Sequence, residues 1–411
     1  MSFPGLTFPY ILAPMNLPAL QLKRNEGRRL RAGHVWIFSN EIDTARTPLN
    51  TFEAGQDVQI IDENGKFIAY GYVNPNTLIC ARLVSRDKEH PLSASLISHR
   101  LNIALSLRER LFSVPYYRLV YGEGDGLPGL VVDRFGDVLS VQITTAGMEN
   151  HREDILACIE KLLRPKAIIL RNDSSIRELE GLERYIEVPF GTAPEVLDIV
   201  ENDCRFQAPA QTGQKTGWFY DHRLNRSRLT RYVKDMRVLD VFSYLGGWAI
   251  PAAVAGASDV ICIDESIPAI EQIHANAKLN NVENKIATLQ GDAFDGLKQL
   301  RADRERFDVI VLDPPAFIKR KKDVRKGVEA YRRLNQMAMQ LLSKDGILVS
   351  ASCSYHMARD ELRQQIQLAA RHVDRTAAII EQGHQGPDHP IHPAIPETDY
   401  LKAFFCRVLT G

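Results

Sequence analysis

Residues 236–247, MRVLDVFSYLGG, hold the pattern that decides the fold: a near-continuous apolar run that ends in two glycines ahead of a helical stretch. Apolar runs of the same kind alternate with helical stretches along the rest of the chain. They are DVICIDE (259–265), IATLQGD (286–292), FDVIVLD (307–313), GILVSAS (346–352), AAIIEQG (377–383) and YLKAFFCRVL (400–409). This alternation is typical of a sheet that is buried on both faces. We therefore predict an α/β fold with a doubly wound, mostly parallel, seven-stranded sheet over residues 201–411.

The last run, YLKAFFCRVL, narrows the choice between nucleotide cofactors. It follows a break rich in Pro, His and Gly, and we expect it to insert antiparallel to its neighbours. That topology resembles class I S-adenosylmethionine (SAM) methyltransferases, whereas ordinary dehydrogenase folds lack it. The G-x-G-x-x-G fingerprint of dinucleotide-binding folds is also absent after the first apolar run. The sequence therefore favours SAM over a nicotinamide cofactor.

Two smaller domains are expected ahead of this sheet. Residues 20–90 hold short β runs separated by Gly, Asn, Asp and Pro, which is typical of a small β barrel or sandwich. Residues 91–200 begin with a helical stretch and continue in the order β-β-α-β-β, with strands expected at 130–134, 138–144, 167–171 and 185–189. Residues 1–19 are expected to form a flexible tail, and Met15 leaves open whether residues 1–14 belong to the native protein.

Composition places the chain among globular proteins. Apolar residues make up 45% and charged residues 25% of the 411 residues, which argues against disorder, collagen or a disulfide scaffold. Lys plus Arg and Asp plus Glu number 51 each, so any attraction to nucleic acid must come from local basic patches. The six cysteines are widely scattered, so we expect a reducing compartment and no metal site. Because no apolar run approaches the ~20 residues of a membrane helix, we expect a cytoplasmic protein without membrane contact.

Glycines and strand-end carboxylates predict where an adenosine cofactor binds. The two glycines of residues 243–247 allow the chain to turn tightly and to approach a ligand at a helix start. Asp264 ends the second strand, where a carboxylate commonly accepts the two ribose hydroxyls. Asp292 ends the third strand and is a candidate for the adenine amino group. The cofactor candidates are Asp240, Phe242, Ser243, Gly246, Gly247, Asp264, Glu265, Asp292, Ala293, Phe294 and Asp313.

The fourth and fifth strand ends carry the candidate chemistry. Asp313 is followed by Pro314 and Pro315, which stop the strand and stiffen the backbone. The fifth run ends at Cys353, which is expected beside Asp313 at the neighbouring strand end. Carbon 5 of cytosine is a weak nucleophile, and enzymes activate it by first adding a thiolate to carbon 6. Cys353 is therefore the candidate nucleophile, and Asp313 is expected to hydrogen-bond the N3/N4 edge of the base.

Several motifs together resemble one family. They are GQKTGWFYDHR (213–223), DVFSYLGG (240–247), LDPPAF (312–317), SCSYH (352–356) and the tail that ends in YLKAFFCRV. This combination resembles the RlmI-type family of bacterial 23S rRNA cytosine-C5 methyltransferases, from about Met15 to the end of the chain. The resemblance implies an RNA-binding PUA domain at residues 20–90 and a cytosine of 23S rRNA as the substrate. It also places the family's thiol at Cys353 and its acidic residue at Asp313.

Basic segments are the candidates for RNA binding. The first lies at the start of the small β domain, and the second follows Asp313 directly, where cations would grip RNA phosphates beside the catalytic residues. The segment at 213–223 is implied by the resemblance to close over cofactor and target. The substrate candidates are Lys23, Arg24, Arg28, Arg29, Arg31, Lys215, Asp221, Arg223, Pro314, Phe317, Lys319, Arg320, Lys321 and Lys322.

Two alternatives stay open on the sequence. An amino-nitrogen methyltransferase of guanine or adenine would use Asp313-Pro314-Pro315 and leave Cys353 structural, although the aromatic that such enzymes carry directly after Pro-Pro is shifted here to Phe317. The second alternative is a non-catalytic RNA-binding factor of ribosome assembly, which keeps the methyltransferase fold but transfers no methyl group. The sequence also leaves open whether the partner is naked 23S rRNA or a large-subunit assembly particle, and whether the chain forms a homodimer.

Overall fold

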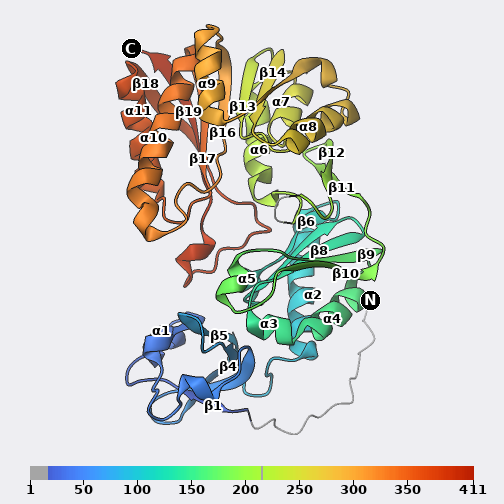
Figure 1. Cartoon of the computed structure of the whole chain (residues 1–411), viewed down its shortest axis with the longest axis vertical. Coiled ribbons are helices and arrows are strands. Elements are labelled where there is room, and N and C mark those ends of the chain that lie inside the picture. The colour runs from blue at the N-terminus through green and yellow to red at the C-terminus, as the bar shows by residue number, and fades with distance from the viewer. Residues whose placement is uncertain (1–16, 214–215) are drawn as a thin grey trace.

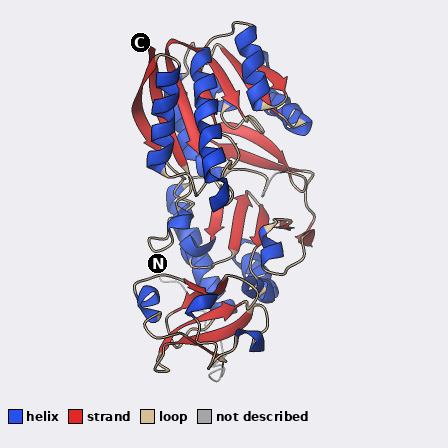
Figure 2. Ribbon diagram, turned by 60° about the vertical axis from the view of Figure 1, so that its left-hand side comes forward, coloured by secondary structure: helices blue, strands red, loops and turns tan. Residues whose placement is uncertain are grey.

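Three sheets of five or more strands follow one another along the long axis of the molecule, and a fourth, two-stranded sheet joins two of them (Figure 1). The computed structural model describes residues 17–213 and 216–411. The chain builds a small β domain at the bottom of Figure 1, a central domain above it and a large α/β domain at the top. Figure 2 shows helices packed against the strands of the central and large sheets. The predicted tail falls almost entirely on residues 1–16, which lie outside the described residues, as does Lys215.

The small β domain is a five-stranded sheet in the order β1-β3-β4-β5-β2. Its strands are β1 (Ala19–Gln21), β2 (Trp36–Phe38), β3 (Gln56–Ile61), β4 (Phe67–Val73) and β5 (Ile79–Ser85). The short helix α1 (Gly27–Arg31) carries part of the first basic segment. Leu20, Val58, Ile60 and Leu83 fill a separate core, so the predicted small β domain is confirmed.

The central sheet runs in the order β10-β9-β8-β7-β6. Its strands are β6 (Tyr116–Tyr121), β7 (Leu130–Phe135), β8 (Val138–Ile143), β9 (Ala167–Asn172) and β10 (Tyr185–Gly191). Apolar residues of α2 (Ala94–Leu111) and α4 (Arg152–Leu163) pack with residues of the sheet in one core. Strand β6 was not predicted, because Arg118 interrupts its apolar run. The Arg118 guanidinium pairs with Asp133 on β7 at 2.7 Å, a partner that the sequence pattern does not show.

A hairpin joins the central and large domains. It consists of β11 (Val196–Glu201) and β12 (Cys204–Pro209), which the sequence did not predict as strands. Leu197, Ile199 and Phe206 of this hairpin pack with Trp218 in the core of the large domain. The hairpin therefore crosses the predicted boundary between residues 200 and 201.

The large sheet has the order β15-β14-β13-β16-β17-β19-β18. Its strands are β13 (Arg237–Val241), β14 (Asp259–Asp264), β15 (Ile286–Gln290), β16 (Phe307–Leu312), β17 (Leu342–Ser352), β18 (Arg375–Gly383) and β19 (Lys402–Thr410). The first five are parallel, and β19 is antiparallel to both of its neighbours. The predicted seven-stranded, mostly parallel sheet and its antiparallel last strand are therefore confirmed.

Helices cover both faces of the large sheet. Successive residues of a strand face opposite sides, so Val238 and Leu239 of β13 enter two different cores. Helices α7 (Ala249–Val254) and α8 (Ile267–Leu279) contribute to the first core. Helices α9 (Ala293–Ala302), α10 (Val324–Leu341) and α11 (Arg359–His372) contribute to the second. Because both faces are buried, the edge formed by the carboxyl ends of the parallel strands is left for ligands.

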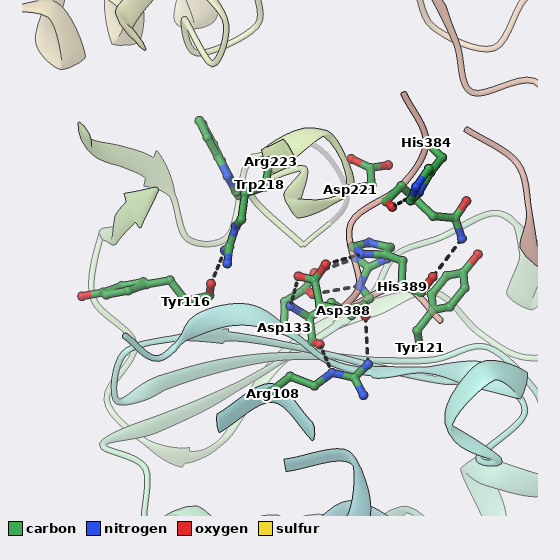
Figure 3. Close-up of polar contacts among 12 residues, drawn as sticks. Arg108, Tyr116, Tyr121, Asp133, Trp218, Asp221, Arg223, His384, Asp388 and His389 are labelled. Atoms are coloured by element: carbon green, nitrogen blue, oxygen red, sulfur yellow. Dashed lines mark hydrogen bonds and ion pairs between the residues drawn. The ribbon is translucent and has the colours of Figure 1, made fainter. Parts of the chain in front are cut away.

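The segment between β18 and β19, residues 384–401, leaves the large sheet and reaches the central domain, and we call it the strap (Figure 1). Its Asp388 is fully buried and accepts a hydrogen bond from the backbone N–H of Arg118 at 3.1 Å. His389 lies 3.0 Å from the other carboxylate oxygen, and Arg108 donates to the Asp388 carbonyl at 2.8 Å (Figure 3). These contacts fasten the strap to the central sheet.

We expect Asp388→Asn to destabilise the protein by about 1–3 kcal/mol, because the variant keeps the shape but loses a charge that buried donors satisfy. Burial raises the pKa of Asp388, but His389, Arg223 and the N–H of Arg118 outweigh it and hold the pKa below its usual value. A lowered folded-state pKa gives stability that is present above the unfolded pKa and is lost as the pH falls below 3.8. The free energy of unfolding, measured with urea at pH 7 and at pH 3, should differ less between the two pH values for the variant than for the wild type. An equal difference for both proteins would contradict the role of this carboxylate.

Candidate active site

A cavity of about 450 Å³ lies at the carboxyl ends of the parallel strands. It is lined from the sheet side by Phe242, Ser243, Tyr244, Gly247, Trp248, Ile263, Asp264, Glu265, Ser266, Gly291, Asp292, Ala293, Asp313, Pro314, Pro315 and Cys353. The opposite wall comes from the segment ahead of β13, through Trp218, Phe219, Asp221, His222 and Arg226. The structure thus brings many predicted cofactor residues and both predicted catalytic residues into one cavity.

The loop after β13 has the shape that a nucleoside ligand requires. Phe242 and Tyr244 have φ angles of 66° and 51°, and Gly246 has 80°, so the chain turns through left-handed conformations. Asp264 holds the loop, because it accepts hydrogen bonds from the backbone N–H of Tyr244 at 2.8 Å and of Ser266 at 3.0 Å. The neighbouring Glu265 is exposed at the cavity wall, and its carboxylate has no partner among the described residues. These residues fit a SAM nucleoside, with carboxylates available for its hydroxyls.

Some predicted cofactor residues do not line the cavity. Asp240 is fully buried behind the loop and accepts a hydrogen bond from the Ser243 hydroxyl at 2.6 Å. Burial raises the pKa of Asp240 to about 7. Gly246 shapes the loop, and the Phe294 ring lies 6.4 Å from that of Phe317. Asp240, Gly246 and Phe294 therefore lie outside the lining of this cavity, and their contact with the cofactor stays a prediction.

Asp292 lines the cavity while it also begins a helix. One of its oxygens accepts hydrogen bonds from the N–H groups of Phe294 and Asp295 at 2.9 and 3.1 Å, which caps the N-terminus of α9. The other oxygen has no hydrogen bond to a described residue. A carboxylate that is held by a helix cap and has one oxygen left over suits an amino group of a ligand.

Asp313 is held at the end of β16 by two side chains from different parts of the chain. Trp248 Nε1 donates to one carboxylate oxygen at 2.9 Å, and His222 Nε2 lies 3.1 Å from the other. Burial raises the pKa of Asp313, but His222 and the hydrogen bond from Trp248 outweigh burial and hold that pKa below its usual value. Asp313 is therefore an oriented, ionised hydrogen-bond acceptor at neutral pH.

The orientation of His222 follows from its neighbours. Arg228 donates to Oδ1 of Asn225 at 2.9 Å, so the amide NH₂ of Asn225 faces Nδ1 of His222 at 3.2 Å. A donor at Nδ1 makes that nitrogen an acceptor and places the ring proton on Nε2, which faces Asp313. His222 is thus a positioning residue for the carboxylate.

Cys353 lies directly after β17 and next to the Asp313 loop. Its sulfur is 3.9 Å from the carbonyl oxygen of Pro314, and the side chain is partly exposed to the cavity. The other five cysteines are buried. Ser352 donates to the Tyr331 hydroxyl at 2.9 Å, which fixes the backbone ahead of Cys353. The structure therefore places a thiol and an oriented carboxylate at the same wall.

Lys402 supplies a cation behind the Cys353 loop. Its ammonium donates to the carbonyls of Ser354 and Tyr400, each at 2.8 Å, and the residue is only 5% exposed. Burial lowers the pKa of Lys402 to about 8, although Asp399 and Cys353 act in the opposite direction. The lysine is cationic at neutral pH, and a nearby cation favours a thiolate.

We therefore expect Lys402→Met to raise the pKa of the Cys353 thiol and to slow its alkylation at neutral pH, because the thiolate loses its cation. The rate of iodoacetamide alkylation of the Cys353 peptide, followed by mass spectrometry from pH 6 to 10, measures this shift. Lys344→Met is the matched control, since Lys344 lies exposed at the far end of β17. The same alkylation profile in both variants would show that Lys402 does not act on the thiol.

The predicted RNA-binding residues fall into three groups. Lys319, Arg320, Lys321 and Lys322 are exposed just after the Asp313 loop, and none has an ion pair with a described residue. In the small β domain, Lys23, Arg24, Arg28 and Arg31 are exposed, whereas Arg29 pairs with Glu41 at 2.7 Å and Arg31 also pairs with Asp62. Asp221 and Pro314 line the cavity, and Phe317 packs on Tyr331 beside it.

Arg223 requires a correction, because it is not accessible to RNA. Its guanidinium donates to the Tyr116 carbonyl, lies 3.6 Å from Glu201 and stacks over the Phe112 ring (Figure 3). The residue is buried between the central and large domains. Helical spacing is the sequence signal that distinguishes Arg223 from the residues around it. His222 and Arg226 are four residues apart, so they share one side of the helix, and both line the cavity. Arg223 does not share that spacing and does not line the cavity.

The resemblance placed the segment at 213–223 over the site, but sequence reasoning did not single out the four side chains that form this wall, which are Trp218, His222, Arg226 and Trp248. The indole of Trp218 donates to Glu201 at 3.0 Å, and Arg226 pairs with the same carboxylate at 2.8 Å. These contacts join three segments of the chain. No group of three His, Cys, Asp or Glu side chains suited to a metal gathers within residues 17–213 and 216–411, and no helix there is long and apolar enough to cross a membrane.

Comparison with known proteins agrees with this geometry. The family model of a PUA-like domain matches residues 20–86, and that of an S-adenosylmethionine-dependent methyltransferase matches residues 174–404. The ribosomal RNA large subunit methyltransferase I of Erwinia tasmaniensis is 36% identical over 395 residues, which cover 95% of this chain and 99% of the relative. The chain belongs to the ribosomal RNA large subunit methyltransferase I family. The Klebsiella pneumoniae protein of the same name is also 36% identical, over 95% of this chain and 98% of its own.

Solved structures show the same fold as this methyltransferase I family member. SMU.776, a protein described as a methyltransferase and complexed with SAH, superposes with a TM-score of 0.81 at 20% identity, over 95% of this chain and all of its own. A SAM-dependent methyltransferase structure from Streptococcus mutans superposes with a TM-score of 0.79, also at 20% identity, over 95% of this chain and 100% of its own. The protein is therefore a SAM-dependent methyltransferase with a PUA-like domain, as predicted.

Proposed function

We propose that the protein transfers a methyl group from SAM to carbon 5 of a cytosine in 23S rRNA and forms 5-methylcytosine through a covalent Cys353 adduct. The observation that carries this proposal is the placement of the Cys353 thiol, 3.9 Å from the Pro314 carbonyl, beside the oriented carboxylate of Asp313. An amino-nitrogen transfer needs the carboxylate but has no use for a thiol at this wall. The names of the relatives support ribosomal RNA as the substrate.

The proposed chemistry begins at the sulfur. The Cys353 thiolate forms a bond to carbon 6 of cytosine, the electrons of the carbon 5–carbon 6 double bond shift toward N3 so that carbon 5 becomes enamine-like, and N3 takes up a proton from water. Asp313 accepts hydrogen bonds from the N4 and N3 edge and stabilises the adduct. Carbon 5 then takes the methyl group, whose bond to the donor sulfur breaks, and N3 returns its proton to water. A base removes the carbon 5 proton, and the electrons of that C–H bond restore the carbon 5–carbon 6 double bond and expel the Cys353 thiolate.

The remaining residues of the cavity prepare this reaction. When bound, SAM supplies an electrophilic methyl group. Ser243, Asp264, Glu265 and Asp292 would hold its nucleoside part, at the end of the cavity that the three strands β13, β14 and β15 form. His222 and Trp248 keep the Asp313 carboxylate turned toward the base.

RNA would reach this cavity along the exposed basic residues. Lys319, Arg320, Lys321 and Lys322 follow the Asp313 loop, and contacts from them to phosphates would help to offset the few kcal/mol needed to flip a base out of its stack. The PUA-like domain at residues 20–86 offers Arg24 and Arg28 as further exposed cations. The proposal has two alternative forms of the substrate, which are naked 23S rRNA and a large-subunit assembly particle that contains it.

The test uses 23S rRNA and large-subunit particles from a strain that lacks the protein. Each is incubated with the purified protein and tritiated SAM, and the labelled nucleotide is mapped. The proposal expects one cytosine that carries the label on carbon 5. Label on an exocyclic amino group of guanine or adenine would replace it with an amino-nitrogen activity, and RNA binding without any label would indicate a binding factor.

A further inference from the structure

A second cavity, of about 410 Å³, lies on the central sheet beneath the strap. It is lined by Arg118, Tyr121, Val131, Gln142, Asp173, Ser174 and Tyr400. Six of these residues come from the central domain, to which the proposed chemistry assigns no role. We propose that this cavity binds a nucleobase of the RNA that lies close to the target nucleotide. The inference rests on the proposed RNA methyltransferase function.

The floor of this cavity is a regular row of the sheet. Tyr121 of β6 pairs with Val131 of β7, and Val131 pairs with Gln142 of β8, so the three side chains stand side by side on one face. The opposite face of the same strands packs on α2 and α4. The row is partly exposed, and the strap closes one side through Tyr400.

Aromatic rings give the cavity a surface for stacking. The rings of Tyr121 and Tyr400 lie 6.3 Å apart at 40°, and the Arg118 guanidinium lies 5.9 Å from the Tyr121 ring centroid. The Tyr121 hydroxyl donates to the Thr398 carbonyl at 3.2 Å, which fixes the ring near the strap. Aromatic and guanidinium planes are the usual platforms for unstacked RNA bases.

Polar groups in the cavity have hydrogen-bonding capacity left over. Arg118 uses Nε and Nη2 for Asp133, at 2.8 and 2.7 Å, and its Nη1 has no hydrogen bond to a described residue. The side-chain amide of Gln142 and the hydroxyl of Ser174 likewise have no side-chain hydrogen bond within the described part of the chain. An amide and a guanidinium can read the donors and acceptors on the edge of a base.

The charges of the cavity favour a base over a phosphate. The guanidinium of Arg118 is already balanced by Asp133, and the carboxylate of Asp173, which also lines the cavity, pairs with Arg171 at 3.2 Å. The cavity therefore offers no unbalanced cation among its lining residues. A phosphate would meet the Asp173 carboxylate, whereas a neutral base would accept or donate hydrogen bonds at the same place.

The two cavities share a wall. The Tyr400 hydroxyl donates to Asp221 at 2.6 Å; Tyr400 lines the second cavity and Asp221 lines the first. Tyr400 is also joined to the catalytic loop, because Lys402 donates both to its carbonyl and to that of Ser354. A nucleotide near the target in sequence would therefore reach the second cavity while the target occupies the first.

The test uses an RNA hairpin that carries the nucleotide labelled in the mapping experiment, with an abasic site placed in turn at each nearby position. Dissociation constants are measured by fluorescence anisotropy for the wild type and for Gln142→Ala, which removes only the amide. Gln382→Ala is the matched control, because Gln382 is exposed on β18 in the large domain. We expect Gln142→Ala to weaken binding about five-fold, which is the effect of one lost hydrogen bond, and to raise KM without lowering kcat.

The decisive result is the coupling between protein and RNA changes. One abasic position should weaken wild-type binding about ten-fold, and on that RNA Gln142→Ala should add no further loss, because the amide has lost the base that it contacts. Equal effects of every abasic site on both proteins, or normal binding by Gln142→Ala, would overturn the proposal. If the label appears on a base other than cytosine, the same series of abasic sites is placed around that base and tests the cavity in the same way. If no RNA is labelled, the protein is crosslinked to 23S rRNA with ultraviolet light. Adducts at Tyr121 or Tyr400 would support a base in this cavity, whereas adducts at other residues only would overturn the proposal.

Discussion

Replacing Cys353 with Ala should lower methyl transfer by at least about 10⁴-fold, because carbon 5 of cytosine loses its activating adduct. The loss should appear in kcat, with the dissociation constant for SAM unchanged. The side chain is small and partly exposed to the cavity, so the truncation leaves the core intact. Incorporation of tritium into 23S rRNA under single-turnover conditions measures the rate, and calorimetry measures SAM binding.

Cys158→Ala is the matched control for this variant. Cys158 lies on α4 in the central domain, and its thiol donates to the Ala94 carbonyl at 3.3 Å, away from the cavity. It should transfer methyl groups at the wild-type rate. If Cys353→Ala kept even a tenth of the wild-type rate while the product was 5-methylcytosine, the thiol route would be wrong. Retained transfer to an amino nitrogen would favour the other chemistry of the Asp313-Pro314-Pro315 loop.

Asp313→Asn should lower kcat by about 10²–10³-fold, since a charged acceptor for the N3 and N4 protons of the adduct becomes a neutral amide. The amide oxygen can still accept from the Trp248 indole, so the loop should keep its shape. Thermal unfolding and SAM binding should therefore change little. Single-turnover rates with saturating SAM and RNA measure the chemical step.

The control and the pH profile make this second prediction specific. Asp303→Asn changes an exposed carboxylate at the end of α9 and should be silent. Because the pKa of Asp313 is lowered by His222 and Trp248 despite burial, the wild-type rate should show no acid limb from this carboxylate above pH 5. A variant rate within three-fold of the wild type, or an acid limb that vanishes only in Asp313→Asn, would contradict the role assigned to the carboxylate.

The large sheet and its chemistry could be predicted because both depend on local patterns. Apolar runs set the strands, and parallel strands bring their carboxyl ends to one edge, so Cys353 and Asp313 were placed together before any coordinates. The antiparallel β19 followed from the same pattern and from the break ahead of it. These inferences needed only the order of elements along the chain.

Other features depend on partners that are distant in sequence. Strand β6 was missed because Arg118 looks like a loop residue until Asp133 on β7 neutralises it. Arg223 was expected to contact RNA because the resemblance implies that the segment at 213–223 closes over cofactor and target, yet Glu201 and the Tyr116 carbonyl bury it. The strand-end position of Asp240 suggested a cofactor contact, but its carboxylate points behind the loop to Ser243. In each case a tertiary contact decided the role.

The most direct test of the account uses RNA in which the target cytosine is replaced by 5-fluorocytidine. Fluorine at carbon 5 cannot leave as the proton does, so a thiolate adduct would remain attached after the methyl group has been transferred. We predict a covalent protein–RNA complex that resists denaturation, forms only when SAM is present and carries the nucleotide on the Cys353 peptide in mass spectrometry. Turnover of normal RNA to 5-methylcytosine without any trapped complex, or a complex attached to a different residue, would contradict the central claim.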